Sequence, residues 1–128
     1  MIDSILDASA LLALLQDEPG AGRVAAALPG AAISSVNLAE VVSKLADKKM
    51  PPQLIQKTLQ GLDLNVIGFD EGLAYAAGNL RPATAALGLS LGDRACLALA
   101  RHLDAPALTS DASWGRLNIE KLTVEVIR

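Results

Sequence analysis

The chain has 128 residues, a net charge of −3 and 52% hydrophobic residues, which is enough apolar material for one globular core. The negative charge gives no overall attraction for nucleic acid, and the only aromatic side chains, too few for a base-stacking platform, are Phe69, Tyr75 and Trp114. A single histidine excludes a multi-histidine zinc site, and a single cysteine, Cys96, excludes an internal disulfide. No apolar stretch has the length of a membrane span and no basic signal-peptide region is present, so we expect a cytoplasmic protein with one domain over residues 1–128.

Strand and helix patterns alternate along the chain. In the first half, the sequence predicts a strand ending at residue 6, a helix over 8–16, a short helix ending near 28, a strand within 29–35, a helix over 36–49 and a helix from 51 onward. In the second half, it predicts a strand over 64–69, a helix over 70–88 with a break at Pro82, an apolar helix over 90–103, a strand over 105–110 and an edge strand over 122–128. Strands that alternate with helices are typical of a mainly parallel sheet covered on both faces, so we expect a three-layer α/β/α domain.

Four carboxylates fall where a predicted strand ends or a helix begins. They are Asp7 after the first strand, Glu40 in the first turns after the second, Asp93 at the start of the helix over 90–103, and Asp111 after the strand over 105–110. In parallel sheets, ligands bind outside the carboxyl ends of the strands. We therefore expect these side chains, which are far apart in sequence, to meet at one edge of the sheet.

Each of these acids also has a purely structural explanation. The structural roles are an N-cap at Asp7, a capping-box spacing of Asn37 with Glu40, a helical pair of Glu40 with Lys44, a cap-like spacing of Ser90 with Asp93, and an Asx turn at Asp111. Asp70 also follows a strand, and we expect it to be a helix cap only. A position after a strand therefore does not by itself identify a functional carboxylate.

Clustering would make the four carboxylates repel one another strongly. Two charges a few ångströms apart repel by roughly 3–4 kcal/mol at an effective dielectric constant near 20, whereas a helix N-terminus offsets only about 0.3–1 kcal/mol. Raised pKa values, a basic side chain or divalent cations must therefore neutralise the cluster, and ligands made of oxygen alone favour Mg²⁺ or Mn²⁺. The polar side chains near the acids in sequence, which would support them, are Ser9, Asn37, Thr109 and Ser110.

Four motifs together resemble those of PIN-domain ribonucleases, in particular the VapC-type toxins of type II toxin–antitoxin systems. In chain order, the motifs are LDASALLALL with Asp7 and Ser9, SSVNLAEV with Asn37 and Glu40, LGLSLGDRACLALA with Asp93, and ALTSDASW with Thr109, Asp111 and Trp114. The resemblance covers nearly the whole chain, and no acidic position of the family pattern is missing. It implies a PIN-like fold, metal-dependent cleavage of RNA, a VapB-type antitoxin as the partner, and a homodimer.

The resemblance also implies a division of roles within the site. Asp7, Asp93 and Asp111 would hold one or two Mg²⁺ or Mn²⁺ ions, and Glu40 would orient or deprotonate the attacking water. Among the basic residues, we expect Arg94, the neighbour of Asp93, to contact phosphate ahead of the other candidates, which are Lys44, Lys48, Lys49, Arg81 and Arg116.

Two other functional classes remain open. A PIN fold kept as a non-catalytic binding partner or repressor subunit would carry the same motifs without cleaving RNA. A receiver-type phosphoacceptor module would need paired acids near the N-terminus and a lysine after the last strand. Here Asp3 is a weak second acid, and Lys121 precedes the last predicted strand, so the sequence favours the nuclease.

Overall fold

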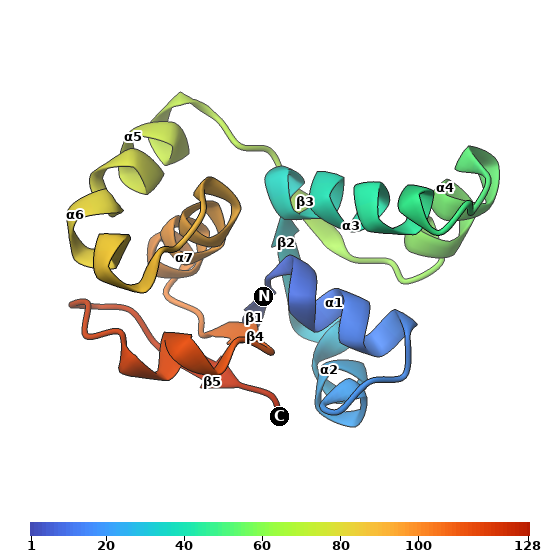
Figure 1. Cartoon of the computed structure of the whole chain (residues 1–128), viewed down its shortest axis with the longest axis horizontal. Coiled ribbons are helices and arrows are strands. Elements are labelled where there is room, and N and C mark those ends of the chain that lie inside the picture. The colour runs from blue at the N-terminus through green and yellow to red at the C-terminus, as the bar shows by residue number, and fades with distance from the viewer.

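A parallel sheet of five strands forms the centre of the computed structural model, which describes residues 1–128 (Figure 1). The strands are β1 (Ser4–Leu6), β2 (Ala31–Ser34), β3 (Asn65–Ile67), β4 (Ala107–Thr109) and β5 (Val124–Val126). They lie in the order β3-β2-β1-β4-β5, and every neighbouring pair is parallel. All five strands lie within the predicted segments, and β5 is an edge strand as predicted.

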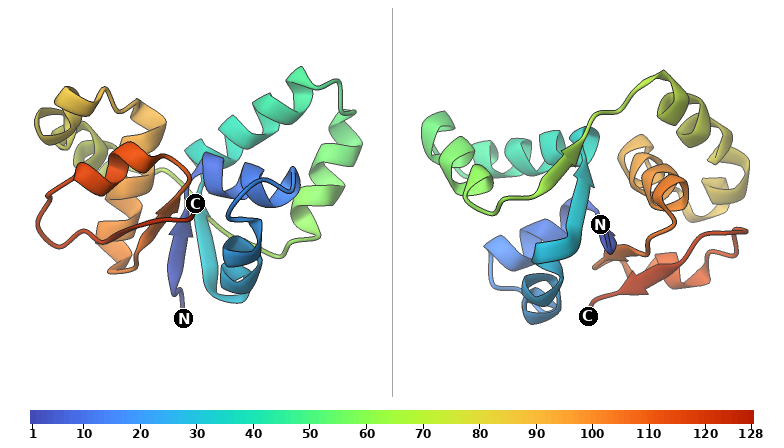
Figure 2. Two further views of the ribbon diagram at one scale, coloured as in Figure 1. Left: turned by 60° about the horizontal axis from the view of Figure 1, so that its bottom comes forward. Right: turned by 180° about the vertical axis from the view of Figure 1, so that it is seen from behind.

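Helices cover both faces of this sheet. The seven α-helices are α1 (Ala8–Leu15), α2 (Ala21–Ala27), α3 (Ser35–Asp47), α4 (Pro52–Gln60), α5 (Glu71–Asn79), α6 (Arg81–Thr84) and α7 (Leu91–Leu103). Two views of the ribbon place α1 to α4 on one side of the sheet and α5 to α7 on the other (Figure 2). The expected three-layer α/β/α architecture is therefore confirmed. Every helix falls short of the length and hydrophobicity that crossing a membrane requires.

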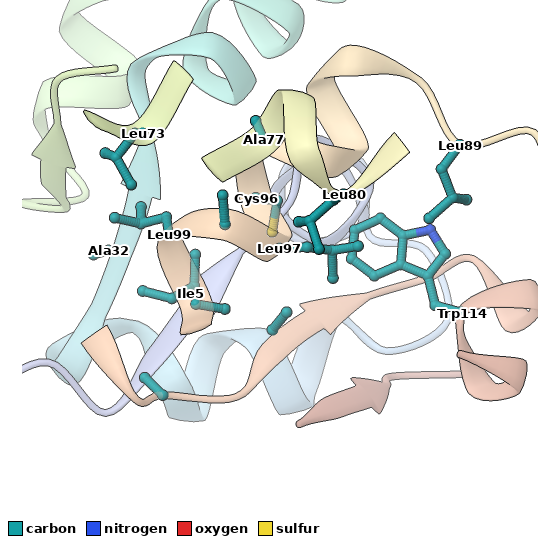
Figure 3. Close-up of a cluster of buried hydrophobic side chains, with 14 residues drawn as sticks. Ile5, Ala32, Leu73, Ala77, Leu80, Leu89, Cys96, Leu97, Leu99 and Trp114 are labelled. Atoms are coloured by element: carbon teal, nitrogen blue, oxygen red, sulfur yellow. The ribbon is translucent and has the colours of Figure 1, made fainter. Parts of the chain in front are cut away.

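The two faces of the sheet bury two separate apolar clusters, because side chains alternate along each strand. Ile5 points with Ala32 and Ala107 toward α5 and α7, where Cys96 and Trp114 complete the cluster (Figure 3). The intervening strand residues, on the face of α1 to α4, are Leu6, Ala31, Ile33 and Leu108. Full burial of one large apolar side chain stabilises the fold by roughly 1.5–3 kcal/mol, so these clusters hold the layers together. Cys96 is a fully buried free cysteine in this core.

The strand order creates a topological switch beside β1. From β1 the chain proceeds outward to β2 and β3, and then returns to the opposite side of β1 to form β4 and β5. A crevice at the carboxyl ends of the strands is expected at such a switch, between β1 and β4. The segments that follow β1 and β4 therefore begin side by side, and α7, which packs on β1, β2 and β4, opens at the same edge.

Helix ends lie within two residues of the predicted ones, except within the segment over 70–88. Asp70 is a cap, as predicted, since its Oδ1 accepts a hydrogen bond from the Leu73 N–H at 2.9 Å. The break expected at Pro82 falls at Leu80, because Pro82 occupies the first turn of α6, where a missing N–H is tolerated. A short 3₁₀ turn, η3 (Ala112–Arg116), follows β4 and was not predicted; the other 3₁₀ turns are η1 (Leu28–Gly30) and η2 (Ala85–Leu87).

Candidate active site

All four predicted carboxylates line one open cavity of about 230 Å³ at the carboxyl edge of the sheet. The lining residues are Asp7, Ala8, Ser9, Leu12, Glu40, Lys44, Asp93 and Asp111. Because α1 and α7 each pack against α3, the acids of these three helices and the acid that follows β4 converge here. Segments far apart in sequence thus contribute to a single acidic surface.

Asp7 is the buried member of the group and is fixed on both of its oxygens. Its backbone N–H donates to the Leu108 carbonyl at 3.1 Å, which ties the end of β1 to β4. Its Oδ1 accepts hydrogen bonds from the Ala10 N–H at 2.8 Å and the Ser9 hydroxyl at 2.7 Å. Its Oδ2 accepts from the Thr109 hydroxyl at 2.5 Å. Asp7 is therefore the N-cap of α1 and also a link between two strands.

Burial raises the pKa of the Asp7 carboxyl from 3.8 to about 6. The hydrogen bonds to its oxygens, that from Thr109 most of all, act in the opposite direction, and the negative charge of Asp93 raises the pKa further. Burial also raises the pKa of the Cys96 thiol well above its usual value, and the charges of Asp7, Asp93 and Glu40 add to that shift. The core behind the cavity therefore experiences the field of three carboxylates together.

Two hydroxyl groups connect the ends of β1 and β4. The Thr109 hydroxyl donates to Asp7 and accepts from the Asp111 N–H at 3.0 Å. The Ser9 hydroxyl likewise donates to Asp7 and accepts from the Ser110 N–H at 2.9 Å. Each hydroxyl donates its one proton to Asp7 and accepts a hydrogen bond from a backbone N–H next to or at Asp111. The two hydroxyls therefore fix the backbone that presents Asp111. This geometry is consistent with the supporting roles expected of Ser9 and Thr109.

Asp93 and Asp111 each use one oxygen in a helix cap. Asp93 Oδ2 accepts from the Ser90 N–H at 2.9 Å, while the Asp93 N–H donates to the Ser90 hydroxyl at 3.1 Å, which is a complete capping box. Asp111 Oδ1 accepts from the Ser113 N–H at 2.9 Å at the start of η3. The structural explanations are thus correct for both residues. In each carboxylate, the second oxygen accepts no hydrogen bond from the protein and is available to a ligand.

Asn37 holds Glu40 against the first turn of α7. Its Nδ2 donates to Glu40 Oε1 at 2.8 Å and to the Gly92 carbonyl at 3.0 Å. Asn37 is not the N-cap that its spacing suggested, because Ser34 caps α3. A Cβ atom at Gly92 would overlap the Glu40 carboxylate. Gly92 therefore contributes to the site through the space that it leaves open, a role that no motif in the sequence indicates.

Lys44 is the one basic side chain that lines the cavity. It follows Glu40 by one turn of α3, yet the helical ion pair expected between them is not formed. The only ion pair of the chain joins Arg23 to Glu125 on another part of the surface, at 2.6 Å. The acidic cavity is therefore not neutralised by direct pairing with a basic side chain.

Arg94, the basic residue expected to contact phosphate, points elsewhere. Its side chain is buried against α5, and its Nη1 donates to the Ala77 carbonyl at 3.0 Å. It does not line the cavity. The structure therefore gives no support to a phosphate contact by Arg94, since one residue along a helix rotates a side chain to a different face.

The side-chain groups of this cavity that could bind a cation are all oxygens, and such ligands favour Mg²⁺ or Mn²⁺ over zinc. A buried carboxylate with a raised pKa and no cationic partner is also a group that a bound cation would stabilise. As the side chains stand, no three acidic, histidine or cysteine residues are close enough to one another to form a metal-binding group. Binding of a cation to several of them therefore requires their carboxylates to approach one another.

Comparisons with known proteins agree on one fold. The family model described as PIN domain matches residues 4–120, whereas no curated protein sequence matches the chain. Three similar solved structures are VapBC2 from Rickettsia felis bound to a DNA fragment from their promoter, a toxin–antitoxin complex from Klebsiella pneumoniae, and DNA-bound VapBC from Salmonella typhimurium. The TM-scores are 0.74, 0.74 and 0.73, at 22%, 22% and 20% sequence identity. The alignments cover 98%, 94% and 98% of this chain and 98%, 96% and 98% of the respective matched chains.

Proposed function

Because the chain belongs to the PIN-domain family, we propose that it is a divalent-metal-dependent ribonuclease and the toxin of a toxin–antitoxin pair. PIN domains are generally nucleases that use divalent metals, so family membership supports the type of reaction. The proposed substrate is RNA, and the proposed reaction is hydrolysis of a phosphodiester bond.

One observation carries this proposal: four carboxylates from distant segments line one cavity, and none of them forms an ion pair with a basic side chain. Helix capping accounts for the positions of Asp7, Asp93 and Asp111, but capping also occurs at Asp70, which lies outside the cavity. Three aspartates can cap their helices without lying close together, so helix capping does not explain why all three line the same cavity. An oxygen-lined cavity with net negative charge supports binding of Mg²⁺ or Mn²⁺.

The proposed roles of Asp93, Asp111 and Glu40 follow from the oxygens that the fold leaves unengaged. Asp7, Asp93 and Asp111 would hold the cation, Asp93 through Oδ1 and Asp111 through Oδ2. One or two bound ions would lower the pKa of a water molecule and stabilise charge on the phosphate during in-line displacement. Glu40 would orient this water and accept its proton at Oε2, because Asn37 engages Oε1. The water oxygen would join phosphorus as the bond to the leaving ribose oxygen breaks, and that oxygen would take up a proton from solvent.

The toxin role is supported by the proteins that share the fold. The matched structures from Rickettsia felis and Salmonella typhimurium are VapBC complexes, and the one from Klebsiella pneumoniae is a toxin–antitoxin complex. We infer that this chain likewise binds a VapB-type antitoxin, and that it acts as a homodimer. Size-exclusion chromatography with light scattering tests the dimer, and co-purification with the product of an adjacent small gene tests the partner.

The ribonuclease is tested by incubating purified protein with a mixture of cellular RNAs in Mn²⁺ and in EDTA. We expect Mn²⁺-dependent cleavage that is lost in both Asp7→Asn and Asp93→Asn. Asp70→Asn is the matched control, because Asp70 also follows a strand and caps a helix but lies outside the cavity. This control should cleave at the wild-type rate.

Two results would contradict the proposal. Cleavage that persists in EDTA or in Asp93→Asn would indicate a contaminating nuclease or a different site. A folded wild-type protein that cleaves no RNA with Mn²⁺ would leave the non-catalytic binding partner as the remaining interpretation. Circular dichroism of every variant establishes that folding is retained.

A further inference from the structure

The position of Lys44 distinguishes it from every other basic residue of the chain. Of eleven lysine and arginine residues, only Lys44 lines the carboxylate cavity. It lies on α3 one turn beyond Glu40, so its flexible stem can bring the ammonium group to the rim of the cavity while Glu40 faces the interior of the site.

The ammonium group of Lys44 is not used by the fold. No carboxylate lies within ion-pairing distance of it, although its neighbour one turn earlier is acidic. The side chain is exposed, and it makes no hydrogen bond to the backbone. A lysine that stabilised α3 through Glu40 would show the pair that is missing here. Its charge is therefore available to a ligand in the cavity.

A phosphate that enters this cavity needs such a cation. Four carboxylates repel a phosphodiester, and cations bound among them would reverse the sign of the potential only at their own positions. A phosphate oxygen that these cations do not contact would need another positively charged partner. A lysine ammonium with three donors is a suitable partner for that oxygen.

We propose that Lys44 binds a phosphate of the RNA strand at the rim of the carboxylate cavity. This inference rests on the proposed ribonuclease function and adds to it the residue that recognises the substrate backbone. Lys44 takes the role that the sequence suggested for Arg94, whose guanidinium is enclosed by α5.

The test is steady-state cleavage of a single-stranded RNA oligonucleotide with Mn²⁺, measured for wild type, Lys44→Ala, Lys44→Arg and Lys57→Ala. A contact made equally with bound substrate and transition state affects KM and leaves kcat unchanged. We expect KM of Lys44→Ala to rise about tenfold, the lower end for a charged hydrogen bond. Lys44→Arg should restore KM. Lys57→Ala, which removes the same charge from the exposed surface of α4, should behave as wild type.

Salt dependence separates a phosphate contact from a structural role. Loss of one phosphate contact reduces the slope of log(kcat/KM) against log salt concentration by about 0.7 for a single strand. Lys44→Ala should show this reduction at an unchanged melting temperature, because the side chain is exposed.

The outcomes distinguish failure of this inference from failure of the proposed function. An unchanged KM and salt slope in Lys44→Ala, with active wild type, overturns the role of Lys44 and leaves the ribonuclease intact. Equal losses in Lys57→Ala, or a fall in kcat alone, also overturn it. Wild type without cleavage overturns the ribonuclease and the role of Lys44 together.

Discussion

Replacement of Asp7 by asparagine should stabilise the metal-free protein at neutral pH, although it removes a residue of the candidate site. Burial raises the pKa of Asp7 to about 6 in the folded chain, against 3.8 for an exposed aspartate. Each unit of pKa difference corresponds to about 1.4 kcal/mol, so ionised Asp7 lowers the free energy of unfolding by roughly 3 kcal/mol relative to its protonated form.

The sign of this effect sets its pH dependence. Folded Asp7 binds its proton more tightly than the unfolded chain does, so its stabilising contribution is complete below pH 3.8 and is lost as the pH rises through about 6. The asparagine variant has no such proton to lose. Its amide group would face the Thr109 hydroxyl in place of an acceptor, which removes one hydrogen bond and costs about 1 kcal/mol at every pH. The net gain at pH 7 is therefore about 2 kcal/mol.

Urea unfolding in EDTA at pH values from 4 to 7 measures this prediction. The free energy of unfolding of Asp7→Asn minus that of wild type should increase by about 2 kcal/mol between pH 4 and pH 7, because part of the effect is already lost at pH 4. Asp70→Asn removes a capping aspartate outside the cavity and is the matched control for the loss of a capping carboxylate. A difference for Asp7→Asn that does not vary with pH would mean that Asp7 is not desolvated in the folded protein.

Three further changes test other parts of the site. Gly92→Ala should destabilise the protein by about 1–3 kcal/mol and lower RNA cleavage, because its Cβ would displace the Glu40 carboxylate; wild-type rates would show that Glu40 is free to move. Arg94→Met should leave cleavage near the wild-type rate and change the free energy of unfolding by less than about 2 kcal/mol. Loss of cleavage in this variant would mean that Arg94 contributes to the active site. Mn²⁺ at one hundred times its Kd should stabilise wild type by about 2.7 kcal/mol in thermal unfolding, and an equal response in Asp93→Asn would locate the ion elsewhere.

The sequence predicted the layers of the fold well because the relevant signals are local. Short apolar runs end at caps such as Asp7 and Asp70, and these caps mark the start of α1 and α5. The same signals did not separate the two aspartates by function. Strand order separates them: β1 is central and adjoins β4, whereas β3 is at the edge of the sheet. Strand order depends on pairing between distant segments, which local patterns do not encode.

The basic residue of the cavity illustrates a different limit. Arg94 adjoins Asp93 in sequence, but adjacent residues on a helix face different directions, and Arg94 points into α5. Lys44 follows Glu40 by one helical turn, a spacing that keeps both side chains on one face. Helical periodicity was therefore the better guide, and this signal was present in the sequence. No signal in the sequence indicated the need for a glycine at position 92, because that need depends on the approach of Glu40 from another helix.

Capping alone does not explain the carboxylate at position 7. Ser34 and Asp70 cap α3 and α5, and a serine or asparagine at position 7 would also cap α1. Asp7 instead adds a buried negative charge that, at neutral pH, makes the metal-free fold less stable than a neutral cap would. The hydroxyl groups of Ser9 and Thr109 hold both of its oxygens in place despite this cost. Binding of a cation by the charged carboxylate explains why an aspartate that burial disfavours is held so firmly at position 7. The stability measurement on Asp7→Asn and the stabilisation by Mn²⁺ therefore both test whether this buried charge serves to bind a cation.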